Sequence, residues 1–73
     1  MAAALGSVLR DERKRQALSQ EALGERAGLH RTYVAGLEAG ARNPSLLSLE
    51  RISDALGVRL SALLSAAEDR GRE

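Results

Sequence analysis

The stretch QEALGERAGLHRTYVAGLEAG, residues 20–40, decides the fold, because it predicts two short helices joined by a tight turn. Leu23 and Ala27 lie four residues apart and therefore share one face of the first helix. Gly28 is typical of the residue that follows a helix end. The second helix is predicted from residue 31 to about residue 39. Taken alone, this pattern also fits two core helices of any small bundle.

Capping and small residues mark the ends and the crossing of these two helices. Ser19 can cap the first helix through its hydroxyl, and Gly40 is predicted to end the second. Gly24 lies inside the first helix, where Gly costs about 1 kcal/mol relative to Ala. A helix that accepts this cost indicates a close backbone approach, so we expect the two helices to cross near Gly24.

Apolar spacing predicts further helices on both sides of this stretch. Residues 2–16 form the first, with one apolar stripe at Leu5, Val8 and Leu9. After a loop at residues 41–45, the helical spacing returns at Leu46, Leu49, Ile52, Ser53 and Leu56. A short fifth helix is expected to contain Leu60, Leu63 and Leu64, and the polar tail at about residues 68–73 is expected to fray. The chain is thus predicted to be one all-α domain of five helices over residues 1–73.

The composition excludes several classes of protein. Seventy-three residues allow one small domain, and the absence of cysteine leaves neither a disulfide framework nor a cysteine-rich zinc site. Apolar residues never run long enough to span a membrane. The net charge is only +1, but residues 1–45 carry seven basic and five acidic side chains. Tyr33 is the one aromatic residue, which argues against an RNA-binding surface of stacked aromatic rings.

Five segments in register carry a resemblance to a known family: LSQEAL at 18–23, AGL at 27–29, RTYVAGLEAG at 31–40, RNPSL at 42–46 and LERISDALGV at 49–58. Together they resemble the lambda-repressor-like (Cro/cI-type, XRE) helix-turn-helix family of bacterial and phage DNA-binding proteins. The resemblance covers about residues 5–64. HRTYVAGLEAGARNPSL further resembles the small controller-type regulators of restriction–modification systems. The lambda-repressor-like resemblance implies a compact five-helix domain that binds double-stranded DNA.

The resemblance, together with the helical pattern, gives a set of candidate DNA-contacting residues. The candidates are Gln20, His30, Arg31, Thr32, Tyr33, Ala35, Gly36, Arg42 and Asn43. In the family, a glutamine at the position of Gln20 commonly bonds a phosphate, and residues at the positions of Arg42 and Asn43 meet the sugar-phosphate backbone. His30 either contacts phosphate or is only a surface turn residue, and it is a poorer helix cap than Ser, Thr or Asp.

The second motif helix is expected to read the bases. With Val34 and Leu37 facing inward, Arg31 and Thr32 fall on the exposed side, where Arg31 can donate two hydrogen bonds to guanine O6 and N7. Ala35 and Gly36 replace larger polar residues that many family members use on bases, so the footprint is narrow or the helix backbone comes closer to the groove. Tyr33 either packs beside the turn or places its hydroxyl against the backbone.

Two further features follow from the resemblance. Family members pair an arginine of the first helix with a glutamate of the recognition helix, which here implies a bridge between Arg13 and Glu38. Ala17 stands where the family commonly has Gly, between the first two helices. Since Gly relieves a left-handed backbone there, Ala17 predicts either mild strain or a different turn.

The resemblance implies a sequence-specific transcriptional regulator, either a repressor or an autoregulator, rather than an enzyme. We expect a homodimer on a palindromic operator, located in the cytoplasm with the nucleoid. Leu60, Leu63 and Leu64 are the candidate dimer interface, unless they only close the core of one chain. No catalytic, cofactor or metal site is predicted. The alternatives are the antitoxin of a toxin–antitoxin pair and a protein-interaction module without DNA binding.

Overall fold

The computed structural model describes residues 1–72, which form five helices and no strand. The helices are α1 (Ala2–Arg15), α2 (Gln20–Ala27), α3 (Arg31–Glu38), α4 (Leu46–Leu56) and α5 (Leu60–Gly71). The predicted all-α class and its five helices are therefore confirmed. No helix in this part of the chain is both long and apolar enough to cross a membrane.

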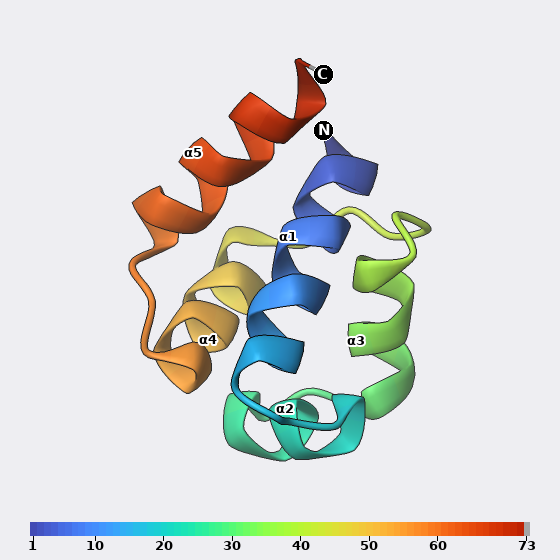
Figure 1. Ribbon diagram of the computed structural model, residues 1–73. Coiled ribbons are helices and arrows are strands. Elements are labelled where there is room, and N and C mark those ends of the chain that lie inside the picture. The colour runs from blue at the N-terminus through green and yellow to red at the C-terminus, as the bar shows by residue number, and fades with distance from the viewer. Residues whose placement is uncertain (73) are drawn as a thin grey trace.

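Helix α1 lies at the centre of the fold, between α5 on one side and α3 on the other (Figure 1). Helix α2 crosses the end of α1, and α4 packs against α2 and α5. Every helix contributes to one apolar core, which contains Leu5, Val8, Leu9, Leu23, Ala27, Val34, Leu37, Leu49, Ile52, Leu56, Leu63 and Ala67. This core fixes α2 and α3 relative to α1 and so positions the predicted recognition helix.

Local capping residues set the helix ends where the sequence predicts them. The Ser19 hydroxyl accepts a hydrogen bond of 2.9 Å from the backbone N–H of Ala22, which satisfies one free donor at the start of α2. Gly28 ends the same helix in the left-handed conformation, with φ of 70°. Ser45 and Gly57 play these two roles for α4.

Two glycines allow backbones to approach closely around the motif. A Cβ atom on Gly24 would lie 2.5 Å from the carbonyl oxygen of Leu29, which confirms the expected close approach and assigns it to the turn. A Cβ atom on Gly6 would lie 2.2 Å from the carbonyl oxygen of Leu37. Gly6 therefore lets α1 contact the end of α3 directly, a role that the sequence analysis did not identify.

One expectation about the second half of the chain is wrong, and it concerns the end of α5. Leu46 follows the predicted helical spacing of α4 and is 65 % exposed. The tail does not fray at Glu68, since α5 continues to Gly71. Arg70 holds it to α1 by donating hydrogen bonds to Ser7 Oγ at 2.6 Å and to Asp11 Oδ2 at 2.7 Å. The last residue of the predicted tail, Glu73, lies outside the described residues.

Candidate nucleic-acid interface

The turn between α2 and α3 is built by backbone contacts. Gly28 adopts φ of 70°, and the N–H of Leu29 donates to the carbonyl of Gly24 at 2.8 Å. Leu29 packs partly buried against the core. The chain therefore reverses within three residues and begins α3 at Arg31.

His30 caps α3, a role for which the sequence analysis preferred Ser, Thr or Asp. Its backbone is extended, and its Nδ1 accepts the N–H of Thr32 at 3.1 Å. The same nitrogen lies 2.8 Å from Thr32 Oγ1. An imidazole nitrogen thus replaces the usual side-chain oxygen, and it also fixes the Thr32 hydroxyl at the exposed start of the helix.

The two sides of α3 differ as the helical pattern predicts. Val34 and Leu37 are buried in the core. Arg31 and Thr32 are exposed at the first turn. Ala35 and Gly36, together with Tyr33, are half-buried, so the exposed side carries large polar side chains only near its beginning.

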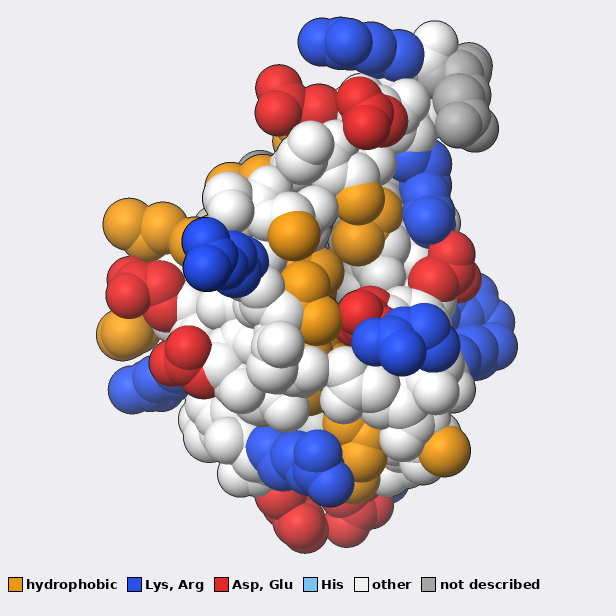
Figure 2. Space-filling view, turned by 60° about the vertical axis from the view of Figure 1, so that its left-hand side comes forward, with side chains coloured by type: hydrophobic (Ala, Val, Ile, Leu, Met, Phe, Trp, Pro, Cys, Tyr) orange, Lys and Arg blue, Asp and Glu red, His pale blue; other side chains and the backbone are white. Residues whose placement is uncertain are grey.

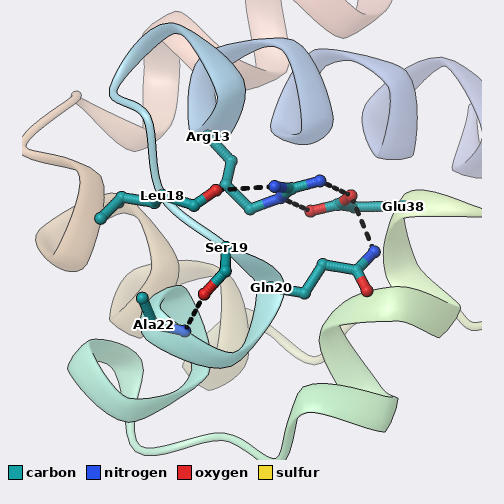
Figure 3. A network of polar contacts seen from close by, with 6 residues as sticks. All are labelled: Arg13, Leu18, Ser19, Gln20, Ala22 and Glu38. Carbon is teal, nitrogen blue, oxygen red and sulfur yellow. Dashed lines mark hydrogen bonds and ion pairs between the residues drawn. The ribbon is translucent and has the colours of Figure 1, made fainter.

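Arg13 and Glu38 form a bridge that ties α1 to α3 (Figure 3). Arg13 Nε and Nη2 donate to the two carboxylate oxygens of Glu38 at 2.7 Å and 2.9 Å. Arg13 Nη1 donates to the carbonyl of Leu18 at 2.7 Å. The side chains are only 10 % and 4 % exposed. Hydrogen bonding to Glu38 raises the pKa of Arg13 above its ordinary value, so the guanidinium is charged at every physiological pH.

Gln20 joins this network at the start of α2. Its Nε2 donates to Glu38 Oε1 at 3.1 Å, so the carboxylate fixes the orientation of the amide (Figure 3). A primary amide has two N–H donors, and one of them stays available to a ligand. One carboxylate therefore connects α1, α2 and α3, the three helices of the predicted reading unit.

A surface hollow lies between α1, the start of α2 and α3. It is lined by Arg10, Arg13, Gln20, Ala35, Glu38 and Ala39. Arg10 is exposed and is not among the candidate DNA-contacting residues named from the sequence. Its spacing of three residues from Arg13 puts both on one helix face, which is the signal that could have identified it.

The loop after α3 folds back, so that the side chain of Arg42 lies against α3. The N–H of Ala41 donates to the carbonyl of Gly36 at 2.9 Å, and Gly40 has φ of 72°. The Cζ atom of Arg42 then lies 5.7 Å from the centroid of the Tyr33 ring. Asn43 is exposed beside it. Both residues are candidate DNA contacts in the sequence, but no pattern there predicts that the guanidinium of Arg42 lies over the Tyr33 ring.

Ala17 adopts φ of 57° between α1 and α2. This left-handed backbone is the strained alternative of the two that the sequence analysis left open. A left-handed backbone costs an alanine roughly 1–2 kcal/mol. The turn is therefore left-handed although the residue is not glycine.

The predicted dimer residues fall into two groups. Leu63 is 2 % exposed and closes the core of the single chain, which is the alternative that the sequence left open for it. Leu60 and Leu64 are half-buried. The face of α4 and α5 carries apolar side chains between charged ones (Figure 2), and Leu46 and Leu47 are 65 % and 57 % exposed.

Groups of three or more potential metal-binding side chains do not occur within residues 1–72. The arrangement instead offers hydrogen-bond donors. Arg31 lies at the start of α3, the Gln20 amide at the start of α2, and Arg42 over the middle of α3. Such donors on two neighbouring helices suit a nucleic acid, which offers phosphate oxygens and the edges of its bases as acceptors.

Comparison with known proteins identifies the family. The family model HTH_3, described as helix-turn-helix, matches residues 9–63. The control protein C.MunI of a Mycoplasma species is 45 % identical over 64 residues, which cover 86 % of each chain.

Solved structures agree with the sequence match. The restriction–modification controller protein C.AhdI from Aeromonas hydrophila has a TM-score of 0.84 and 39 % identity, covering 85 % of this chain and 94 % of its own. The controller protein C.Esp1396I, solved as a tetramer with its natural 35-base-pair operator, has a TM-score of 0.87 and 26 % identity. That match covers 99 % of this chain and 95 % of the controller.

Proposed function

The chain belongs to the helix-turn-helix family, and from this premise we propose that it is a transcriptional regulator that binds a palindromic DNA operator as a homodimer. Its similarity to restriction–modification control proteins favours repression or autoregulation. The observation that carries the proposal is the exposed start of α3, with Arg31 and Thr32 outward while Val34 and Leu37 are buried. This is the geometry that a recognition helix needs in the major groove.

Base reading is assigned to Arg31 and Thr32. Arg31 can donate two hydrogen bonds to guanine O6 and N7, which is the commonest specific contact to a base. The Thr32 hydroxyl is oriented by His30, so its methyl group is the part free to meet a thymine methyl. The half-buried Ala35 adds no large polar side chain to this face.

Backbone positioning is assigned to the start of α2 and the loop after α3. The free N–H of the Gln20 amide and the first backbone N–H groups of α2 suit a phosphate, because a helix N-terminus favours an anion. Asn43 is exposed on the loop and offers an amide donor. Arg10, at the edge of the neighbouring hollow, adds positive charge along the same path.

A dimer is required because one short helix reads few base pairs. The operator complex of C.Esp1396I contains a tetramer of that controller, which supports assembly of symmetric copies on DNA. For this chain we assign the interface to the half-buried Leu60 and Leu64 of α5. The proposal involves no catalysis, cofactor or metal, and it puts the protein on the nucleoid in the cytoplasm.

The test is selection of binding sites from random DNA duplexes with the full chain. We expect two inverted half-sites whose centres are about one helical turn, roughly 10 base pairs, apart. Binding should be at least roughly 10³-fold tighter than to unrelated duplex DNA at physiological salt. Recovery of no enriched sequence, or of a single unpaired half-site, would refute the proposal of a dimeric operator-binding regulator.

A further inference from the structure

We infer that Arg42 reads a base, with Gly36 and Tyr33 holding it over the recognition helix. This inference rests on the proposed function and replaces the backbone-anchoring role that the family resemblance implies for Arg42. Gly36 has no side chain that could contact a base, and Arg42 supplies such a contact from the loop after α3.

Gly36 leaves a gap on the exposed side of α3. It follows Thr32 by four residues and therefore shares its face. A Cβ atom built on Gly36 would lie 3.0 Å from Arg42 Cδ and 3.2 Å from both Cγ and Nε. The stem of Arg42 thus occupies the space in which a side chain at position 36 would begin.

The direction of Arg42 follows from its second contact. Its guanidinium carbon lies 5.7 Å from the Tyr33 ring centroid, whereas its stem lies beside Gly36. The side chain therefore runs along α3 from residue 36 back toward residue 33. This is the direction of Arg31 and Thr32, the residues assigned to the base edges.

Backbone geometry fixes the point from which Arg42 starts. Gly40, with φ of 72°, reverses the chain, and the N–H of Ala41 bonds to the carbonyl of Gly36. Arg42 is the next residue, so little freedom separates its Cα atom from the helix. A long side chain already ordered before binding loses less conformational entropy when it binds.

The position of the Arg42 guanidinium over Tyr33 suits a contact to a base. Its attraction to the ring uses the positive charge and not the planar fork of N–H donors. That fork matches guanine O6 and N7 in the major groove. The same fork also matches a phosphate, so the assignment to a base rests on the direction of the side chain along α3, toward Arg31 and Thr32.

The experiment uses the full chain and the operator obtained by selection. Affinity for that site and for every single-base variant is measured at several salt concentrations. Arg42→Ala should lose roughly 5- to 150-fold on the selected site and should discriminate no longer at one base pair per half-site. Arg51→Ala, which removes the same charge from an exposed position on α4, should leave the ranking of sites unchanged.

Substitutions at the two supporting residues test the geometry. Tyr33→Phe keeps the ring and should keep discrimination at the base pair that Arg42 reads, whereas Tyr33→Leu should weaken it. Gly36→Ala displaces only the flexible stem of Arg42 and should weaken the same base pair. Introduced together with Arg42→Ala, neither Tyr33→Leu nor Gly36→Ala should reduce discrimination there any further. Circular dichroism of each variant confirms that it is folded.

The outcomes separate this inference from the proposed function. If the unmodified protein selects an operator but Arg42→Ala weakens all sequences equally and lowers the salt slope by about one contact per subunit, Arg42 is a phosphate anchor and the inference is overturned. If the unmodified protein selects no sequence, the proposed function itself fails, and the inference fails with it.

Discussion

Removal of the Glu38 carboxylate should strongly destabilise the fold. Glu38→Ala deletes two hydrogen bonds to Arg13 and one to Gln20, and it leaves a guanidinium that is 10 % exposed with the Leu18 carbonyl as its remaining partner. Breaking one side of a buried pair costs about 3–5 kcal/mol. Because the network lies at the edge of the surface hollow, we expect about 3 kcal/mol, at the low end of that range.

Chemical denaturation and thermal melting at fixed protein concentration measure this loss. A domain of this size has a total stability of about 4–11 kcal/mol, so the variant should keep about 1–8 kcal/mol of it. Its melting temperature should fall by roughly 12–24 °C. Fixed concentration matters because dimer formation adds stability by mass action.

A matched control lies on α1 itself. Glu12 forms the same paired contact with Arg15, at 2.6 Å and 3.0 Å, but Arg15 is 69 % exposed. Glu12→Ala should therefore change the unfolding free energy far less than Glu38→Ala. Equal losses in the two variants would refute the reasoning that burial makes the Glu38 network costly to break.

A double replacement distinguishes a stranded charge from a lost attraction. Arg13→Met combined with Glu38→Leu removes both charges and fills a similar volume, so it should be more stable than Glu38→Ala alone. The Gln20 amide would still lose its acceptor. The double variant should therefore bind the selected operator more weakly although its fold is restored.

Three further predictions concern the turn, the interface and acid sensitivity, and a fourth concerns the reading residue. Ala17→Gly should raise the unfolding free energy by about 0.5–1 kcal/mol, because relief of the left-handed backbone exceeds the added chain entropy; a lower melting temperature would contradict this. Leu64→Glu should give a folded monomer in sedimentation, whereas Leu63→Glu should unfold the chain because Leu63 is buried in the core. Hydrogen bonding to Arg15 lowers the pKa of Glu12 from its ordinary value of 4.5. The Glu12 carboxylate therefore stabilises the fold above pH 4.5, and this contribution is lost as the pH falls through the lowered pKa of the folded state. The melting temperature of Glu12→Gln should change less over the same acid range than that of the unmodified protein. Arg31→Ala should lose roughly 1–3 kcal/mol on the selected site and relax one base pair per half-site, and an unchanged ranking of single-base variants would show that Arg31 does not read a base.

Helix ends could be predicted from the sequence because their causes are local. Ser19 and Ser45 cap the helices that follow them, and Gly28 and Gly57 end them in the left-handed conformation. Each of these signals involves residues within one helical turn of each other. The Arg13 side chain reaches Glu38 across 25 positions of the chain, and only resemblance to a family pointed to that pair.

Features that depend on how the helices pack could not be predicted. Leu46 and Leu49 share the helical spacing of α4, yet Leu49 is buried and Leu46 is 65 % exposed. The sequence predicts that Arg70 belongs to a frayed polar tail, but its side chain donates hydrogen bonds to Ser7 and Asp11 of α1. The stacking of Arg42 on Tyr33 depends on the path of the loop after α3, which no helical pattern describes.

The shared carboxylate of Glu38 has a consequence for operator geometry. Because it joins α1, α2 and α3, the recognition helix cannot swing independently of its own subunit. One base pair added between the half-sites separates them by about 3.4 Å and rotates one about the DNA axis by roughly 34–36°. The subunits can follow that change only through the dimer interface or through bending and twisting of the DNA. Tolerance to half-site spacing should therefore be governed by α5 and by the flexibility of the spacer sequence, and not by the helix that reads the bases.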